Sequence, residues 1–569
     1  MKRLILLPNP RRVELQDTPR MPWNKPLATL VVPGVLPAQG YRLVLTAERI
    51  EITAGDEAGQ FYARKTLQQL EREFPDGYPT GVIEDWPDFP VRGVMLDISR
   101  DKVPRMETLM MLVDELAEWK INRFELYTEH TFAYARHPDV WAMASPMTPT
   151  EIRQLDSYCR ERFIELVPNQ NSFGHMERWL KIPRLRHLAE CPDGFDAGWG
   201  KQPPATLDPT NPGSIDLLGE LYDELLPNFT SRNMNVGCDE TFELGLGRSR
   251  TECERRGKGR VYLDFLLKVY ELTQRHGRRM HFWGDIILEH PELIGELPRD
   301  VVPLAWGYEA TKPFGPACEA FANAGLEFFV CPGTSSWLSI LGRTANCLAN
   351  LDDAARSGRR CNASGYLVTD WGDRGHWQQL PISYLGYAVG AALSWCYQTN
   401  YDQPWAEVLN RHVFHDPTGV LGRIAYDMGN AYQEVGYPSY KGRFFHDLIE
   451  KGRAAFPELP AEVCHRALDY LDRAERHLPS ARPLRPDAAW LYEEFAHSFR
   501  MARFACRVGL NEDPLKLGAE LRVLMGEHQR LWLQRNRPGG LYDSLKRFER
   551  RLAEFDAVSV AARGQTIKT

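Results

Sequence analysis

A repeated pairing of a short apolar strand with a helical stretch dominates the middle of this 569-residue chain. Eight such units lie between Val91 and about Asn400, and their strands are expected at residues 93–97, 123–127, 164–168, 234–237, 280–283, 301–306, 327–330 and 365–369. Near-continuous apolar strands that alternate with amphipathic helices indicate a parallel sheet whose outer face is covered by helices. Eight of these units predict an α/β fold of the (β/α)8 TIM barrel type.

A doubly wound open sheet is the main alternative architecture. Its nucleotide-binding form carries a Gly-x-Gly-x-x-Gly turn after the first strand, and no such turn follows residues 93–97. The barrel also predicts where function lies, because catalytic groups of TIM barrels follow the strands on the carboxyl-terminal face.

Carboxylates or tryptophans stand at six of the predicted strand ends. In chain order, the side chains at and after the strands are Glu129 and His130, then Asn171 and His175, Asp239 and Glu240, Trp283 and Asp285, Trp306 and Tyr308, Trp337, and finally Trp371 and Asp373, while Arg92 precedes the first strand. A single tryptophan usually packs into a core, but four at one rim indicate an aromatic pocket with polar anchors. Such a pocket suits a sugar, which stacks its C–H face and hydrogen-bonds its hydroxyls.

Two adjacent acids, Asp239 and Glu240, end the fourth predicted strand. Neighbouring strand residues point to opposite faces, so both can reach one pocket only where the strand ends or twists. The structural alternative is that Asp239 caps a helix and Glu240 pairs with an arginine. A two-carboxylate glycosidase takes its acids from opposite sides of the scissile bond. Adjacent acids suit a mechanism in which a 2-acetamido oxygen of the substrate attacks its own anomeric carbon.

The flanks of the barrel differ from it in pattern. Residues 1–85 are expected to form a small α/β domain, with strands at 41–45 and 50–52 and a helix at 59–74. The barrel takes residues 86–400, and residues 401–569 form a helical domain with long helices at 462–477, 488–508 and 514–534. These helices would cover the barrel or form the face of a homodimer. The break at residues 535–541 separates two helices, and its reach toward a site is left open.

Composition excludes several classes of protein. The hydrophobic fraction of 43% and charged fraction of 25% are typical of a globular protein. A net charge of -7 gives no reason to expect nucleic acid or an anionic membrane as partner. The eleven cysteines include no Cys-x-x-Cys pair, and the apolar run at residues 4–7 is short for a signal peptide. We therefore expect a reducing, cytoplasmic setting. No His-x-His follows the first strand, so no metal is expected.

Three segments, met in order, resemble glycoside hydrolase family 20, the β-N-acetylhexosaminidases. Residues 85–100 resemble the entry of that family into its barrel, residues 171–175 (Asn-Ser-Phe-Gly-His) its third-strand histidine loop, and residues 236–240 (Val-Gly-Cys-Asp-Glu) its Gly-x-Asp-Glu signature. The N-terminal unit resembles the companion domain of the family, so the resemblance spans about residues 1–400. It implies an exo-acting, retaining hydrolase without cofactor. The implied substrate is an oligosaccharide or glycoconjugate with a terminal β-linked GlcNAc or GalNAc.

The resemblance also implies roles for individual residues. Glu240 would be the general acid and then the general base, with a pKa raised by burial. Asp239 would hold the acetamido N–H and balance an oxazolinium ion. Among the substrate-binding residues, Arg92 would bind the C3 and C4 hydroxyls, and His175 would join a charge network that links Glu129 or His130 to Glu240. The aromatic pocket would consist of Trp283, Trp306 and Trp371, and Asp373 would take the place of a family glutamate.

The chain departs from the family pattern after the seventh and eighth strands. Where the family has Tyr-x-Asp, this chain has Trp337-Leu338-Ser339, so an indole N–H would replace the tyrosine hydroxyl. Asp373 is one methylene shorter than the family glutamate. These departures predict that the chain belongs to a divergent subgroup of the family. They leave open whether the enzyme prefers GlcNAc or GalNAc as the terminal sugar. The competing hypotheses are a carbohydrate-binding barrel without turnover and a two-carboxylate glycosidase for sugars that lack the acetamido group.

Overall fold

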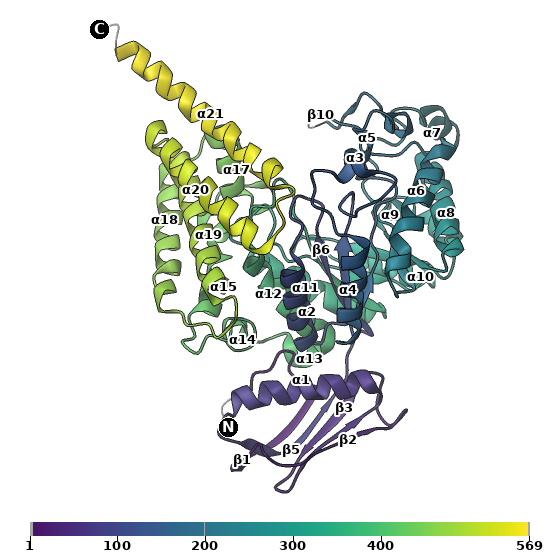
Figure 1. Cartoon of the computed structure of the whole chain (residues 1–569), viewed down its shortest axis with the longest axis vertical. Coiled ribbons are helices and arrows are strands. Elements are labelled where there is room, and N and C mark those ends of the chain that lie inside the picture. Colours follow the sequence, from purple (N-terminus) through teal and green to yellow (C-terminus); the bar gives the residue numbers. More distant parts are fainter. Residues whose placement is uncertain (1–3, 199, 567–569) are drawn as a thin grey trace.

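The computed structural model describes residues 4–198 and 200–566 (Figure 1). Eight parallel strands form the central sheet: β6 (Val91–Asp97), β7 (Arg123–Tyr127), β8 (Glu165–Val167), β11 (Asn233–Asn235), β12 (Arg279–Trp283), β13 (Val302–Trp306), β14 (Phe329–Cys331) and β15 (Gly365–Asp370). Their order is β11-β12-β13-β14-β15-β6-β7-β8, and a parallel bridge between Asn169 and Asn235 joins the two ends. The sheet is therefore a closed (β/α)8 barrel, as predicted.

Helices cover the outside of the barrel. They are α2 (Met106–Glu118), α4 (Pro149–Arg160), α6 (Pro212–Leu225), α8 (Lys258–Arg275), α10 (Gly315–Asn323), α11 (Thr344–Arg360) and α12 (Tyr384–Trp395). The fifth unit has only the short α9 (Asp285–Leu288) and a 3-10 turn in this place. The interior is filled by a separate apolar cluster that includes Trp283, Trp337 and Trp371. The barrel is thus a packed core with aromatic side chains at its carboxyl-terminal end.

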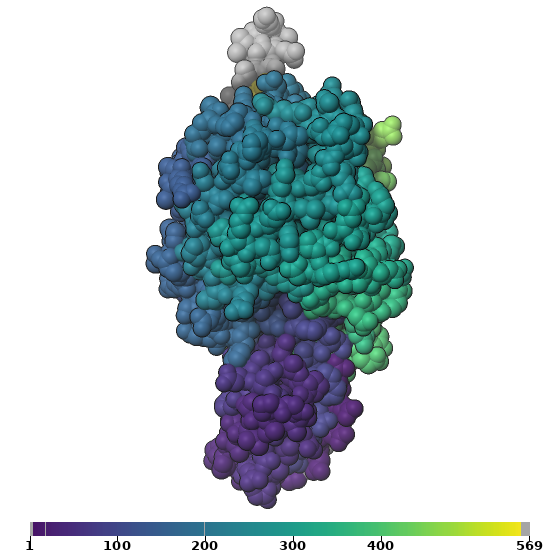
Figure 2. Space-filling model, turned by 90° about the vertical axis from the view of Figure 1, so that its right-hand side faces the viewer, coloured from purple at the N-terminus to yellow at the C-terminus, as the bar shows by residue number. Residues whose placement is uncertain are grey.

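The N-terminal domain is a five-stranded sheet with one helix. Its strands are β1 (Arg12–Met21), β2 (Leu27–Val31), β3 (Tyr41–Leu45), β4 (Ile50–Ala54) and β5 (Tyr78–Asp85), in the order β1-β5-β3-β4-β2, with α1 (Glu57–Glu73) packed on it. Figure 2 shows this domain as a narrower lobe at one end of the molecule. A buried ion pair of 2.9 Å between Lys120 and Asp85 joins it to the barrel. This contact lies at the amino-terminal end of the strands, whereas the active sites of TIM barrels lie at the carboxyl-terminal end.

The C-terminal region is helical and lies beside the barrel (Figure 1). Its helices are α14 (Trp405–His412), α15 (Leu421–Met428), α16 (Ala431–Val435), α17 (Phe444–Lys451), α18 (Ala461–Glu475), α19 (Ala488–Gly509), α20 (Pro514–Arg535) and α21 (Leu541–Thr566). The three long helices expected from the sequence are confirmed. Among the helices of the described residues, none is both long and apolar enough to cross a membrane.

The break between α20 and α21 packs directly against the loop that follows β6. The backbone N–H of Arg105 donates to the carbonyl of Arg535, and that of Arg537 donates to the carbonyl of Val103. Gly540 has a φ of +77°, and a Cβ there would lie 1.9 Å from the carbonyl oxygen of Asp101. The C-terminal region therefore packs against this loop and supports it. Residues 535–541 do not line the pocket at the strand ends that is described below.

Candidate active site

A pocket of about 450 Å³ opens where the strands of the barrel end. Ten residues line the pocket: Arg100, His175, Asp239, Glu240, Trp306, Tyr308, Trp337, Trp371, Asp373 and Lys441. Seven of them are among the predicted site residues, and the other three are Arg100, Tyr308 and Lys441.

The backbone after β11 leaves the strand geometry and brings both acids to one pocket. Gly237, Cys238 and Glu240 have φ values of +67°, +66° and +48°, in the left-handed region that side chains other than glycine rarely adopt. Only glycine fits at position 237, because a Cβ would lie 1.9 Å from Oδ1 of Asn171. Strain of this kind gathers at functional sites. It lets Asp239 and Glu240 face the same space, which a regular strand forbids.

Asp285 holds this turn in place from the next unit. Its Oδ2 accepts a hydrogen bond of 3.0 Å from the backbone N–H of Glu240. Burial, and then the negative charge of Asp239, raise the pKa of Asp285 to about 8. A third carboxyl group thus lies behind the acidic pair and is largely protonated at neutral pH.

His175 contacts both acids from the loop after β8. Its Nε2 lies 3.3 Å from Oδ2 of Asp239 and 3.5 Å from Oε2 of Glu240. Burial lowers the pKa of His175, but the charge of Asp239 and the contacts with both carboxylates outweigh burial and raise that pKa to about 10. Arg100 Nη2 lies 3.1 Å from the other ring nitrogen, Nδ1, and opposes protonation there. The carboxylates thus favour the protonated imidazole, whereas Arg100, which can only donate, favours a neutral ring with Nδ1 as acceptor.

The pKa of Glu240 shifts in the direction opposite to the one predicted. Burial raises this pKa, but the contact with His175 and the positive charges of His175, Arg100 and Lys441 together lower it below its ordinary value. The prediction of a raised pKa was therefore wrong for the unliganded pocket, because it counted burial and not the cations around the carboxylate.

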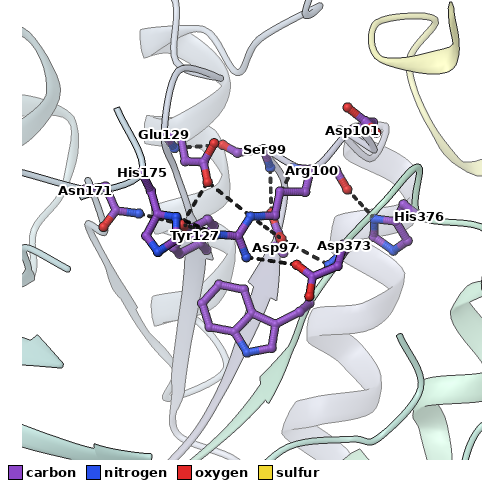
Figure 3. A network of polar contacts seen from close by, with 12 residues as sticks. Asp97, Ser99, Arg100, Asp101, Tyr127, Glu129, Asn171, His175, Asp373 and His376 are labelled. Atoms are coloured by element: carbon purple, nitrogen blue, oxygen red, sulfur yellow. Dashed lines mark hydrogen bonds and ion pairs between the residues drawn. The ribbon is translucent and has the colours of Figure 1, made fainter. Parts of the chain in front are cut away.

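Arg100 is the central cation of the pocket (Figure 3). Its Nε donates to Glu129 at 3.1 Å, its Nη1 to Asp373 at 3.1 Å and its Nη2 to the hydroxyl of Tyr127 at 3.0 Å. Its guanidinium lies 5.0 Å and 4.9 Å from the ring centres of Tyr127 and Trp371. Through Arg100, Glu129 joins the charge network of His175, whereas His130 lines a separate cavity. The planar fork presents fixed donors to a ligand.

Arg92 lies outside the pocket, which corrects the prediction that it binds substrate. Arg92 is fully buried near the start of β6, where its guanidinium donates to the carbonyls of Lys120 and Phe89 and to the side chain of Gln39. That end of the strand faces the N-terminal domain. Arg100, which follows the same strand at its other end, occupies the position that the prediction gave to Arg92. The rule that TIM-barrel sites follow the strands already favoured Arg100.

Aromatic rings form one wall of the pocket. Trp306 stacks on Tyr308 with ring centres 5.1 Å apart, and Trp337 meets the same tyrosine edge-on at 5.1 Å. Trp283 is 1% exposed and lies beneath Trp371 at 6.1 Å, so it supports the wall without lining it. Tyr308 was noted at its strand end but was not among the predicted binding residues. Its ring completes the wall.

Several buried polar atoms of the site lack a hydrogen-bond partner within the described residues. They include Oδ1 of Asp239 and the indole nitrogen of Trp283. The indoles of Trp306 and Trp371 lie toward Asp285 and the hydroxyl of Tyr308, respectively. Buried polar groups are normally paired, so such a group of unpaired acceptors and donors points to a ligand with both an N–H and an oxygen acceptor.

Two groups of side chains have the donor set of a metal site. The ligand atoms of His175, Asp239 and Glu240 lie within 4.8 Å of one another, and the same holds for His446, Asp447 and Glu450. In the first group, the raised pKa of the imidazole favours a proton over a metal ion. In the second group, arginines pair with the carboxylates, as Arg443 does with Asp447 at 2.7 Å. Both arrangements are balanced by protein cations.

Comparison with known proteins places these features in a family. The profile described as "Glycosyl hydrolase family 20, catalytic domain" matches residues 89–350, and the one described as "Glycosyl hydrolase family 20, domain 2" matches residues 6–86. A beta-hexosaminidase of Akkermansia muciniphila is 27% identical over 319 residues, which are 50% of this chain and 63% of that protein. Hexosaminidase D of Homo sapiens is 26% identical over 231 residues, 39% of this chain and 46% of that protein. The matches thus span less than two thirds of either relative.

Solved structures share the fold. A beta-N-acetylhexosaminidase crystal structure superposes with a TM-score of 0.59 at 21% identity and covers 74% of this chain and 96% of that one. A chitobiase of Flavobacterium johnsoniae superposes with a TM-score of 0.57 at 17% identity and covers 95% of this chain and 98% of that one. Two profiles of one family match consecutive parts of the chain and together span more than half of it, and the barrel carries the acidic pair of residues 239 and 240. The chain belongs to glycoside hydrolase family 20.

Proposed function

We propose that this protein is an exo-acting β-N-acetylhexosaminidase that removes terminal β-linked GlcNAc or GalNAc with retention of configuration. The observation that carries the proposal is the buried, unpaired Oδ1 of Asp239, which lies in a pocket that is also lined by Trp306, Tyr308 and Trp371. A 2-acetamido group offers one N–H and one carbonyl oxygen, the complement of this set. The beta-hexosaminidases among the relatives support the same substrate class.

The geometry supports a mechanism in two steps. In the first, Asp239 accepts the acetamido N–H, the acetamido oxygen bonds to the anomeric carbon, and Glu240 transfers its proton to the departing glycosidic oxygen. In the second, Glu240 takes a proton from water, whose oxygen bonds to the anomeric carbon and opens the oxazolinium ring. Arg100 and Asp373 offer donors and acceptors to the hydroxyls of the terminal sugar. The hydroxyl of Tyr308 or an indole N–H holds the acetamido carbonyl.

A two-carboxylate glycosidase is disfavoured by the same geometry. Such an enzyme places its carboxylates on opposite sides of the scissile bond. Here both acids contact a single imidazole nitrogen, at 3.3 Å and 3.5 Å, and therefore lie on one side of the pocket.

The proposal is tested with a panel of p-nitrophenyl β-glycosides of GlcNAc, GalNAc, glucose and galactose. We expect release of nitrophenol from the acetamido sugars alone, and we expect a thiazoline analogue of the cyclic intermediate to block it. The ratio of the two acetamido rates decides between GlcNAc and GalNAc. Turnover of glucosides would contradict the substrate-assisted mechanism. Absence of turnover, with saturable binding of GlcNAc, would instead indicate a carbohydrate-binding barrel.

The charge network predicts a shift in the pH profile when His175 is replaced. The pKa of Glu240 is lowered in the free enzyme, so the protonated acid is lost, and kcat/KM falls, as pH rises through that low pKa. His175→Gln removes the cation that lowers this pKa while burial still raises it. We therefore expect the falling limb of kcat/KM for a GlcNAc disaccharide to move to higher pH.

The matched control for this shift is His187→Gln, an exposed histidine outside the pocket. Its falling limb should coincide with that of the wild type. A limb that stays in place in His175→Gln, or moves to lower pH, would show that His175 does not set the pKa of Glu240.

A cytoplasmic setting and a homodimer formed through the C-terminal helices stay predictions. All eleven cysteines are unpaired and ten are buried, which supports the first. Tyr492 on α19 and Val523 on α20 are exposed apolar side chains, which supports the second.

A further inference from the structure

One residue of the pocket comes from outside the barrel. Lys441 belongs to a short turn, residues 440–442, between α16 and α17 of the C-terminal region. The backbone there takes two successive left-handed conformations, with φ of +50° at Lys441 and +64° at Gly442. A Cβ at position 442 would lie 2.5 Å from Cδ of Arg343, so the turn needs glycine there. Such strain persists only where the surrounding structure enforces it, and here it directs Lys441 to the pocket.

The ammonium group of Lys441 makes no direct ion pair within the described part of the chain. It lies 5.2 Å from the centre of the Tyr440 ring. Tyr440 itself is 68% exposed. By contrast, the other two cations of the pocket are paired: Arg100 with Glu129 and Asp373, and His175 with the acidic pair. Lys441 is therefore the cation of the pocket that is free of a direct ion pair among the described residues.

Lys441 lines the same pocket as Glu240, whose side chain meets solvent. The side chain of Glu240 is 36% exposed and that of Asp239 is 8% exposed, so Glu240 is the outer of the two acids. The charge of Lys441 acts on Glu240 and lowers its pKa. In the proposed reaction Glu240 protonates the glycosidic oxygen. The group attached to that oxygen, the aglycone, therefore lies beside Glu240, the acid on which the charge of Lys441 acts.

We propose that Tyr440 and Lys441 form a subsite for an aglycone sugar that bears a negative charge, a carboxylate or a sulfate, close to the glycosidic bond. The ammonium binds the anion, and the exposed phenol ring packs against the C–H face of the sugar. The subsite rests on the proposed hexosaminidase function and deepens it, because it names the class of glycoconjugate that the enzyme prefers.

The test compares three disaccharides in which the same N-acetylhexosamine is β-linked to glucose, to glucuronic acid or to 6-sulfated glucose. Wild-type enzyme should show a kcat/KM about two- to fivefold higher for a charged aglycone than for glucose, the order expected of one partly exposed ion pair. The preference should weaken as ionic strength rises from about 0.02 M to 0.5 M. The two charged arms separate recognition of the carboxylate from recognition of charge in general.

Lys441→Met should abolish the preference, and Lys441→Arg should keep it. Lys268→Met, on the exposed face of α8, removes the same charge at a distance and should leave the ratio unchanged. Matched thermal unfolding of these variants excludes a folding defect. Equal rates for charged and neutral disaccharides in the wild type would overturn the subsite, and so would a preference that survives in Lys441→Met. In either case, hydrolysis of nitrophenyl GlcNAc would still support the proposed hexosaminidase function. Absence of hydrolysis of every acetamido sugar would overturn both.

Discussion

Replacing Glu240 with glutamine is expected to lower kcat/KM for a GlcNAc disaccharide by about 10²–10⁴-fold, the usual contribution of a positioned general acid. Glutamine keeps the shape of the side chain but has no transferable acidic proton, so a sugar leaving group would depart as an alkoxide. A p-nitrophenyl leaving group needs little protonation. Its first step should therefore be much less impaired, and the gap between the two substrates measures the acid role.

The control for this experiment is Glu254→Gln, an exposed glutamate on α7 (Arg250–Arg256) that follows the acidic pair in the chain. Its kinetics should match the wild type. Affinity for GlcNAc should persist in Glu240→Gln, because Asp239 and Arg100 make the contacts proposed for the sugar. Near-normal hydrolysis of the disaccharide would remove Glu240 from the acid role.

The barrel could be predicted because its physical cause is local in the sequence. Strands buried on both faces are continuous apolar runs, and all eight were found, with ends that differ from the structure by a few residues at most. In the N-terminal domain, β1 and β5 were not predicted, and β1 shows why an edge strand is missed. Its sequence, RVELQDTPRM, mixes polar residues with a proline, and residues 12–14 are exposed. An edge strand of this kind has little hydrophobic pattern to detect.

The acidic pair and the aromatic wall could be predicted for a related reason. Their side chains follow buried strands, and the closed barrel brings all strand ends to one face. The prediction that Arg92 binds substrate was wrong because it relied on similarity to the family. The rule that active-site residues follow the strands would have selected Arg100, since Arg92 precedes most of its strand and Arg100 follows it. The sequence also predicted that the backbone leaves the strand conformation near Gly237 and Glu240, because both acids can share a pocket only if the strand ends there.

Two properties of the site could not be predicted from the chain. The direction of the pKa shift of Glu240 depends on how closely His175, Arg100 and Lys441 approach it, and these residues are 65 or more positions away in the sequence. Lys441 lies in a helical region with no strand end to mark it. Only the three-dimensional packing of that region against the barrel brings the turn at residues 440–442 to the pocket.

Replacing Asp239 with asparagine is expected to lower kcat/KM for every acetamido substrate by about 10²–10³-fold, the size of a lost electrostatic contact to a charged transition state. Asparagine can still accept a hydrogen bond from the acetamido N–H, but it cannot balance the positive charge of the oxazolinium ion. Formation of the ring is common to good and poor leaving groups. The loss should therefore be similar for nitrophenyl and disaccharide substrates, unlike that in Glu240→Gln.

Asp285→Asn separates this charge effect from a loss of structure. With a pKa raised to about 8, Asp285 carries little charge at pH 6, and an asparagine oxygen there can still accept the N–H of Glu240. Its kcat/KM at pH 6 should fall far less than that of Asp239→Asn, although both variants make the same replacement in one cluster. An unchanged rate in Asp239→Asn, or an equal loss in the two variants, would contradict the role proposed for Asp239. The comparison thus tests whether the inner carboxylate acts through its charge, as substrate-assisted hydrolysis requires.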